Sequence, residues 1–420
     1  MQEDFPGSVP PANDGDIGAP LPAIRIPFPP EEFPEAVVHR ARRNVDVVLE
    51  DETTETMFLM RDVSPVGGAA PNESPRTMAA GPQQDQEQHD FPMAYWLFPK
   101  RKEALHRGLK GYIYYALVYE PHHDGVFVYY RPTSRVVVIK KLRKSWVRAN
   151  QHCENPRHEI AAMQQHGDMQ HVLGIVEAME DDRNLYIITP FVGQDLLKCL
   201  VTASAPPNTV QLLRTLVRNL QYLRQQNLIH RDLSPENIII HADLHEACCP
   251  LIDLAMSIRV TTLEGTPQLV NAGHQPCGKP PYMAPEVCCA QVLDFNADVW
   301  SLGCVMFFVW TRQRLYDCYG DDSYRFFLCQ GGLRNGHLME ATLEALLATH
   351  LDTLPLTRRI QAVLQELNEN QRDLLAQMLQ PDTQRRITLE GILEHPWVRQ
   401  EEERQLLAQQ QQQQQNVAEY

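Results

Sequence analysis

The stretch "IHRDLSPENIII" (229–240) places a base, an acid and an amide at tight spacing between apolar residues. Asp232 and Asn237 bring a carboxylate and an amide oxygen onto one loop. Both are hard oxygen ligands that suit Mg²⁺, and a carboxylate can also accept the proton of a hydroxyl nucleophile. Taken alone, the stretch also fits a buried turn in which Asp and Asn act as caps.

Strand-like segments precede this loop, and helical segments follow them. "GYIYYALVYE" (111–120), "GVFVYY" (125–130) and "RVVVIKKL" (135–142) are rich in Tyr, Val and Ile, which favour strands. Residues 209–227 show helical periodicity, and "EALLATHL" (344–351) and "NQRDLLAQML" (370–379) look similar. The apolar face of 209–227 consists of Val210, Leu213, Leu216, Val217, Leu220 and Leu223. This order predicts an α+β chain with two lobes and a ligand cleft at their junction.

The two ends of the chain differ in composition from this central block. Residues 1–92 are rich in proline, acidic residues and glutamine, so we expect them to be largely disordered. Within them, residues 35–60 could form local structure or dock on the main domain. We place one lobe with its lead-in at 93–191 and the other at 192–398. The Gln-rich tail at 399–420 is typical of a solvated extension.

Composition restricts the class of protein. The 420 residues carry a formal net charge of −15, which argues against a nucleic-acid binder. The ten cysteines show no CxxC spacing and the N-terminus is not a signal peptide, so we expect reduced thiols in the cytoplasm or nucleus. The longest apolar run, "VWSLGCVMFFVW" (299–310), is too short to span a bilayer and predicts a buried helix. We expect a monomer without membrane insertion.

The central block resembles a eukaryotic protein kinase domain of the serine/threonine type. Six motifs that carry the resemblance occur in the family's order, which makes the match much more specific than any single one. They are "RVVVIKK" (135–141), "HRDLSPEN" (230–237), "PLIDLAM" (250–256), "GKPPYMAPE" (278–286), "DVWSLG" (298–303) and "QRRITLEGILEHPW" (384–397). The resemblance implies a two-lobed α+β kinase fold. Its N-lobe would be an antiparallel sheet with one main helix, and its C-lobe mostly helical.

The resemblance also implies an ATP- and Mg²⁺-dependent reaction and assigns its residues. Asp232 would accept the proton of the substrate hydroxyl, and Asn237 and Asp253 would bind Mg²⁺. Lys140 would contact the α- and β-phosphates. Its partner on a helix would be Glu159, with Glu154 as the alternative.

The nucleotide-binding residues are the poorest match to the family. Of the glycine-rich loop only Gly125 remains, in "PHHDG" (121–125), so we expect weak contacts to the phosphates. Thr189 would be the gatekeeper, and the Pro190 carbonyl with the Val192 amide and carbonyl would face adenine. Asp195 follows them, and together with Glu236 it could also recognise basic residues in a substrate.

Two further departures belong together. Most serine/threonine kinases carry lysine at the position of Ser234 and threonine at that of Lys279, and in the family fold these side chains are neighbours. Here the hydroxyl and the ammonium are exchanged. We hypothesise that Lys279 supplies the missing positive charge beside the transferring phosphate. Alternatively, Lys279 points to solvent and transfer is slow.

Other motif residues have structural roles in the family. Glu286 would pair with Arg386, and Asp298 would brace the catalytic loop. The segment "NAGHQP" (271–276) contains no hydroxyl, so activity should not depend on phosphorylation at the usual late position of the activation segment.

The favoured interpretation is a kinase that phosphorylates serine or threonine in proteins, with basic residues near the acceptor. The alternative is a pseudokinase scaffold, supported by the lost glycines and by Ser234. A small-molecule or lipid kinase is disfavoured, because "MAPE" and "DVWSLG" belong to the platform that binds protein substrates.

Overall fold

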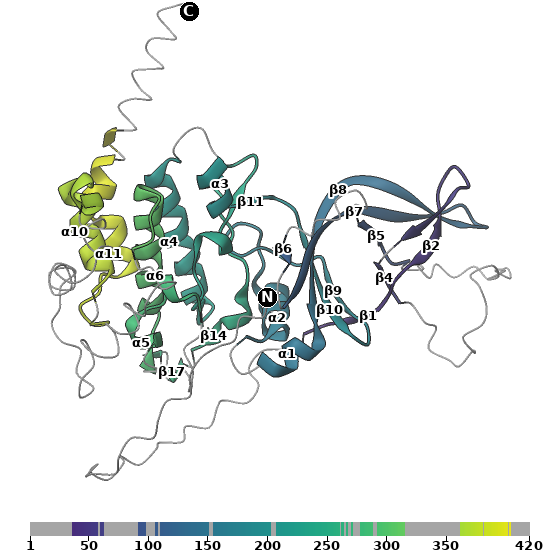
Figure 1. The fold of residues 1–420 in the computed structure, drawn as a ribbon, viewed down its shortest axis with the longest axis horizontal. Coiled ribbons are helices and arrows are strands. Elements are labelled where there is room, and N and C mark those ends of the chain that lie inside the picture. The colour runs from purple at the N-terminus through teal and green to yellow at the C-terminus, as the bar shows by residue number, and fades with distance from the viewer. Residues whose placement is uncertain are drawn as a thin grey trace, which may run out of the picture. The chain divides into compact units, whose positions relative to one another are not determined.

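The amino-terminal part of the described chain is rich in strands and the carboxy-terminal part is mainly helical (Figure 1). This arrangement confirms the predicted two-lobed α+β fold. The computed structural model describes residues 36–57, 59–62, 91–97, 106–107, 110–150, 154–202, 207–260, 262–263, 266–267, 270–271, 278–288, 292–315, 362–380, 382–401 and 403–404. The helix predicted at 344–351 and most of the Gln-rich tail lie outside these residues.

The main sheet has eight strands in the order β5-β4-β1-β9-β10-β8-β7-β6. They are β1 (His39–Arg42), β4 (Leu59–Arg61), β5 (Ala94–Leu97), β6 (His106–Arg107), β7 (Gly111–His123), β8 (Val128–Arg143), β9 (Glu177–Glu180) and β10 (Asn184–Pro190). The pairings are antiparallel except that of β1 with β9. Because β5 also pairs with β7, the strands other than β6 close into a ring. Strand alternation brings together one set of buried side chains: Leu59, Tyr95, Ala116, Val118, Val137, Ile139, Met179, Tyr186 and Ile188.

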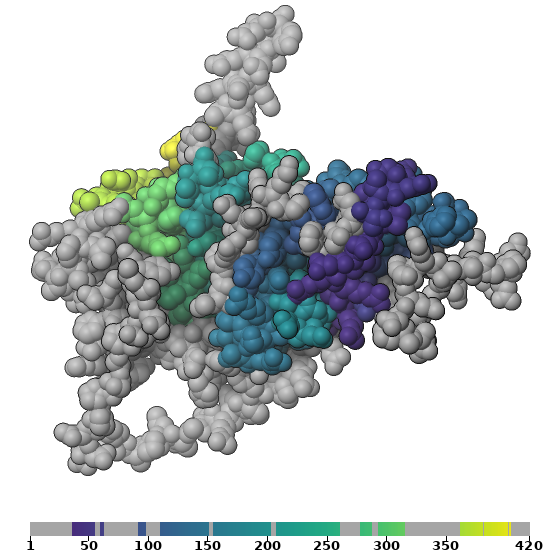
Figure 2. Space-filling model, turned by 45° about the vertical axis from the view of Figure 1, so that its right-hand side comes forward, coloured from purple at the N-terminus to yellow at the C-terminus, as the bar shows by residue number. Residues whose placement is uncertain are grey.

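Strands also occur within residues 1–92, where composition predicts mostly disorder. β1 lies beside β9, and β2 (Val45–Val48) pairs with β3 (Thr54–Met57). Just before β1, the Val37 N–H donates to Gln164 Oε1 (3.0 Å), and Gln164 Nε2 donates to the Val37 carbonyl (2.9 Å). Figure 2 shows these strands, in purple, lying against the blue strands of the sheet. The described residues 36–57 and 59–62 therefore dock on the main domain, while the boundary at residue 92 stays a prediction.

Helix α2 (Pro156–His166) is the main helix packed on the sheet and follows the short α1 (Lys144–Asn150). Asn155 caps α2 by accepting the Arg157 N–H, and a proline fills the first helical position. Ile160 is buried against strand residues such as Leu142. The α2 face that carries Glu159 and Ile160 is thereby directed at the sheet.

The C-lobe helices include α3 (Leu196–Thr202), α4 (Thr209–Gln225), α5 (Pro285–Cys288), α6 (Asn296–Thr311), α10 (Glu369–Met378) and α11 (Leu389–Glu394). All six residues of the predicted apolar face of α4 are buried. Helix α6 contains the longest apolar run and is buried along most of its length, as predicted. The predicted helix at 370–379 corresponds to α10. Among the described residues, none of the helices has both the length and the apolar character that crossing a membrane requires.

Short strands and 3₁₀ turns between β10 and α6 surround the catalytic-loop and activation-segment motifs. The two-stranded pairs are β11 (Gly193–Asp195) with β13 (Ile239–His241), β12 (Leu228–Ile229) with β14 (Ile258–Arg259), β15 (Thr262–Leu263) with β16 (Thr266–Pro267), and β17 (Val270–Asn271) with β18 (Val292–Leu293). The described part of this region also contains three 3₁₀ turns, η1 (Pro235–Asn237), η2 (Leu254–Met256) and η3 (Pro280–Tyr282). Leu228 and Ile229 of β12, Leu254 of η2 and Tyr282 of η3 belong to the large apolar core of the C-lobe, which fixes these elements in place.

Candidate active site

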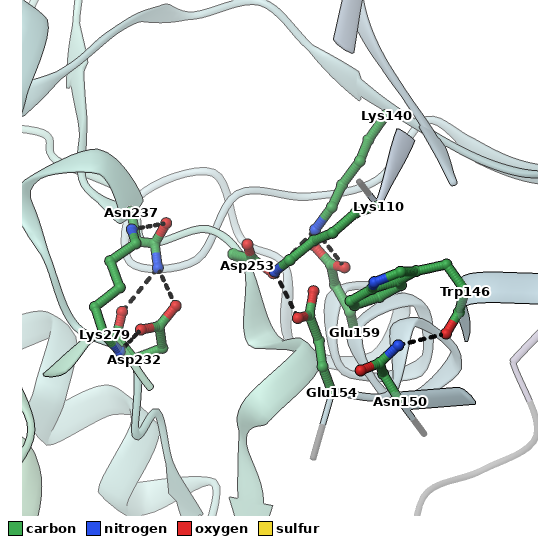
Figure 3. Close-up of polar contacts among 10 residues, drawn as sticks. All are labelled: Lys110, Lys140, Trp146, Asn150, Glu154, Glu159, Asp232, Asn237, Asp253 and Lys279. Atoms are coloured by element: carbon green, nitrogen blue, oxygen red, sulfur yellow. Dashed lines mark hydrogen bonds and ion pairs between the residues drawn. The ribbon is translucent and has the colours of Figure 1, made fainter. Parts of the chain in front are cut away.

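Lys140 on β8 lies between two carboxylates that come from distant parts of the chain (Figure 3). Its Nζ donates to both oxygens of Glu159 on α2, at 3.0 and 2.9 Å. It also donates to Asp253 Oδ1 at 2.9 Å. The predicted pairing of Lys140 with Glu159 is confirmed, and the alternative partner, Glu154, pairs with Lys110 instead (2.5 Å).

The charges of this cluster depend on one another. Burial alone would raise the pKa of Asp253, but the adjacent Lys140 cation outweighs it, and the pKa is lowered to about 2. Burial raises the pKa of Glu159, and Lys140 only partly counteracts this. Burial also disfavours the Lys140 cation, but the two carboxylates raise its pKa overall. Near neutral pH the cluster therefore presents a charged Lys140 and an ionised Asp253.

Asp232 is the centre of a second buried cluster. Its Oδ2 accepts a hydrogen bond from Asn237 Nδ2 (2.9 Å), which also donates to the Asp232 carbonyl (2.7 Å). Its Oδ1 accepts the backbone N–H of Lys279 (2.8 Å). Burial raises the pKa of Asp232, while the Lys279 cation lowers it in part. The carboxylate is thus oriented on both oxygens by donors from two segments.

The Lys279 side chain turns toward the catalytic loop. Its Nζ donates to Ser234 Oγ at 2.7 Å and lies 3.5 Å from Asn237 Oδ1. It also lies 3.6 Å from a carboxylate oxygen of Glu236. Ser234 is fully buried, so its hydroxyl is a fixed acceptor that holds the Lys279 ammonium in place. The exchanged pair is in contact, as the family fold implies; the catalytic role of Lys279 stays a proposal.

The loop that carries Asp232 is braced by α6. Asp298 accepts the backbone N–H groups of His230 (2.7 Å) and Arg231 (2.9 Å), which confirms its predicted bracing role. Arg231 adopts a φ of +63° and Asp253 a φ of +62°. Non-glycine residues rarely adopt such φ values unless the surrounding structure holds them there. Arg231 directly precedes Asp232, and Asp253 is itself a member of the Lys140 cluster.

The segment after Asp253 is connected to α2 and to the catalytic loop. The Asn155 N–H donates to the Ala255 carbonyl (2.8 Å), and Arg231 Nε donates to the Met256 carbonyl (2.6 Å). Leu254 is fully buried in the C-lobe core. Ala255 lies inside the η2 turn, a conformation that a residue with a side chain adopts easily.

The predicted gatekeeper and adenine-facing residues lie at the end of β10 and just after it. Thr189 and Pro190 end β10, opposite Val138 and Val137 of β8. The Val192 carbonyl already accepts the Ala242 N–H (2.8 Å). Of the two backbone groups of Val192 expected to face adenine, the amide is therefore the better candidate.

Asp195 lies after these residues, at the start of α3. Its Oδ1 accepts the Lys198 N–H (2.8 Å), so the side chain caps this helix. Its recognition of substrate or nucleotide stays a prediction.

The prediction that Gly125 binds the phosphates is wrong. Gly125, with a φ of +95°, lies in the turn between β7 and β8, beside the last pair of this hairpin, His123 with Val128. Lys140 pairs with Ile113 near the other end. At about 3.3 Å per residue, the turn lies roughly 40 Å from Lys140 along β8. "VYY" (128–130) and "RVVVIKK" (135–141), expected to belong to separate strands, are parts of one continuous strand, β8.

Two residues near the clusters were given no role from the sequence: Gly278, which begins the motif "GKPPYMAPE", and Lys110. Gly278 has a φ of +114°, and a Cβ there would lie 2.6 Å from the Arg231 carbonyl oxygen and 3.7 Å from Asp232 Oδ1. Glycine thus allows the activation segment to approach the catalytic loop closely. Lys110 lies just before β7 and interacts electrostatically with Asp253 (Figure 3). A short segment of unremarkable composition gave no signal for Lys110.

The predicted pair of Glu286 and Arg386 is confirmed. Two parallel hydrogen bonds join the side chains, at 2.7 and 3.0 Å, and both residues are buried. Arg386 also donates to the Asn296 carbonyl (2.7 Å). The pair joins the end of the activation segment to the last part of the domain.

The donor set fits Mg²⁺ bound together with a nucleotide. Asp253 supplies an ionised carboxylate, and Asn237 directs its N–H groups at Asp232, which leaves its amide oxygen on the other side. Mg²⁺ commonly uses one or two protein oxygens and takes the remaining ligands from phosphate and water. Accordingly, the described residues contain no cluster of three or more His, Cys, Asp or Glu ligands.

Comparisons with known proteins agree with this geometry. Residues 125–398 match the family model described as protein kinase domain. Over 178 residues the chain is 33% identical to "Serine/threonine-protein kinase fused" of Drosophila melanogaster, covering 41% of this chain and 20% of that protein. Over 293 residues it is 27% identical to "Serine/threonine-protein kinase ULK3" of Homo sapiens, covering 68% and 53%. The chain thus matches only a fifth to about half of the length of these relatives. Because the family model spans both clusters, the chain belongs to the protein kinase family.

Proposed function

We propose that the protein transfers the γ-phosphate of ATP to a serine or threonine hydroxyl of a protein substrate. The observation that supports this most directly is that two assembled clusters coexist, one around Lys140 and one around Asp232. Kinase catalysis consists mainly of positioning and charge stabilisation, which these clusters can provide.

Each residue of the clusters has a proposed part. Asp232 orients the substrate hydroxyl and accepts its proton, with its carboxylate fixed by Asn237 and by the backbone of Lys279. Lys140, held by Glu159, directs its ammonium at the α- and β-phosphates. The Pro190 carbonyl and the Val192 amide are proposed to bind adenine.

Asp253 and Asn237 would hold Mg²⁺. When bound, the metal neutralises phosphate charge and orients the phosphates for transfer. Lys279 would add a cation on the acceptor side, in the place where Ser234 leaves none. Its ammonium approaches both the catalytic loop and Asn237, which suits a group that acts on the transferring phosphoryl.

Activity is proposed to be independent of phosphorylation at the late activation-segment position. Arg231, the family's partner for such a phosphate, donates to the Met256 carbonyl. Thr262 and Thr266 lie earlier in the segment, on β15 and β16. We further propose substrates with basic residues near the acceptor, a monomeric protein, and a cytoplasmic or nuclear location.

The deciding experiment is transfer of labelled γ-phosphate from MgATP to a generic basic protein substrate. It compares the wild-type protein with Asp232→Asn and with Asp243→Asn, an exposed control outside the clusters. A Mg²⁺-dependent signal that is lost only in Asp232→Asn supports the kinase. Equal traces in all three proteins would instead support a pseudokinase scaffold.

A further inference from the structure

Lys110 brings a second lysine to the cluster around Lys140, from a segment that carries no glycine-rich motif. Its carbonyl accepts the Arg143 N–H (3.0 Å), which fixes the chain where it enters β7. At the next residue, Gly111, a Cβ would lie 1.8 Å from the Lys141 carbonyl oxygen. The two strands are therefore in close contact here, and the backbone of Lys110 is well placed.

The Lys110 ammonium is directed at the buried end of Glu154. Nζ lies 2.5 Å from Glu154 Oε2 and 5.3 Å from the centre of the Trp146 ring. The side chain of Glu154 is 5% exposed, whereas that of Lys110 is 45% exposed. Figure 3 shows both side chains beside Asp253 and Glu159.

Glu154 is an unusual partner for a purely structural ion pair. Its second oxygen, Oε1, is buried and has no hydrogen-bond partner among the residues that the structure describes. Its charge also adds to the burial that raises the pKa of Glu159, the residue that must hold Lys140. A buried carboxylate with one unsatisfied oxygen and a like charge beside it carries a desolvation cost that offsets much of its attraction to Lys110, so the ion pair by itself contributes little to stability.

We propose that Lys110 is a second phosphate-binding cation, held by Glu154 when no nucleotide is bound and transferred to the nucleotide phosphates when one is. This inference rests on the proposed function, because it requires that the protein bind MgATP. Lys110 lies just before β7, the strand that pairs with the strand of Lys140, and would contact the phosphates from that side. The charge would partly replace the contacts that a glycine-rich loop makes through its backbone amides.

The two partners of the pair give opposite predictions. If Lys110 binds phosphate, Lys110→Met weakens MgATP binding by roughly tenfold or more, the size of one charge-assisted hydrogen bond. Glu154→Gln removes only the competitor for the ammonium, so it binds MgATP at least as tightly as the wild-type protein. If the pair is merely structural, both variants weaken binding alike.

Titration calorimetry of the full chain with MgATP tests this, with adenosine as a probe that lacks phosphates. Lys110→Met should leave adenosine affinity unchanged, and Lys110→Arg should restore most of the MgATP affinity. Lys144→Met is the matched control, since Lys144 pairs with Glu180 (3.2 Å) outside the cluster. Thermal unfolding of each variant shows whether it is folded.

The outcomes separate the inference from the proposed function. Wild-type affinity in Lys110→Met, or equal weakening in Lys110→Met and Glu154→Gln, overturns the inference alone. A wild-type protein that binds adenosine but not MgATP, or neither, overturns both.

Discussion

Replacing Lys279 by methionine tests whether its ammonium supplies the missing charge of the catalytic loop. The side chain is about one third exposed and its Nζ contacts Ser234 Oγ (2.7 Å), so methionine should be accommodated. The backbone N–H that orients Asp232 remains in the variant. The substitution therefore removes mainly one positive charge.

The size of the effect follows from the position of Nζ, 3.5 Å from the Asn237 oxygen proposed to bind metal. At about 5 Å from a phosphoryl charge and an effective dielectric constant near 20, one unit charge contributes about 3 kcal/mol. Since about 1.4 kcal/mol corresponds to a factor of ten, kcat should fall by roughly 100-fold. The KM for ATP should change less, because the contacts proposed for Lys140 with the α- and β-phosphates remain.

The assay is steady-state phosphate transfer with varied ATP. Lys279→Arg should keep most of the turnover, and the double variant Ser234→Lys, Lys279→Thr should recover activity that Lys279→Met loses. Lys198→Met, an exposed lysine on α3, serves as the control. Wild-type kcat in Lys279→Met would show that the exchange idea is wrong.

Three further predictions concern pH, the domain's buried ion pair and the activation segment. In Lys279→Met, the acidic limb of the pH profile of kcat/KM should move to higher pH, because burial raises the pKa of Asp232 and the cation that lowers this pKa is gone. An unchanged acidic limb would contradict this. Glu286→Gln should lower the free energy of unfolding by about 3 kcal/mol or more in a denaturant titration, because it leaves the buried Arg386 without its counter-charge. A loss below about 1 kcal/mol, typical of exposed ion pairs, would contradict this. Gly278→Ala should reduce kcat much more than it changes ATP affinity, since its Cβ would press on the Arg231 carbonyl; equal losses in both quantities would point to general misfolding.

The sequence predicted correctly those parts of the site whose residues lie close together in the chain or at a fixed spacing within a motif. Asp232 and Asn237 share one loop, and α4 and α6 follow directly from their apolar patterns. The pairing of Lys140 with Glu159 was also predictable, because only two acidic residues stand near the expected helix. In each case a few neighbouring residues carry the information.

The assignment of Gly125 failed because the length of a strand is poorly encoded in its sequence. "RPTSR" (131–135) has the composition of a turn, yet β8 continues through it. There the Thr133 hydroxyl donates to the Val118 carbonyl of β7 (2.8 Å), so a polar residue takes part in strand pairing. Because β8 was taken for two strands, the expected phosphate-binding loop was assigned to the turn between β7 and β8, far from Lys140.

The amino-terminal strands and Lys110 could not be predicted for a different reason. β1 and β4 have four and three residues, and their partners β9 and β5 lie far away in the sequence. Such short strands form because they pair with strands that are distant in the sequence, and their own composition gives little indication of a strand. The position of Lys110 likewise depends on how β7 pairs with β8.

The ring of strands has a practical consequence for anyone who shortens this protein. Composition suggests starting an expressed fragment near residue 93, but that fragment would lack β1 and β4. β9 would then present unpaired backbone groups, and an open strand edge invites pairing between molecules. Gln164 on α2 would also lose both of its bonds to Val37. A fragment starting before residue 36 should stay monodisperse in size-exclusion chromatography, whereas one starting at 93 should aggregate.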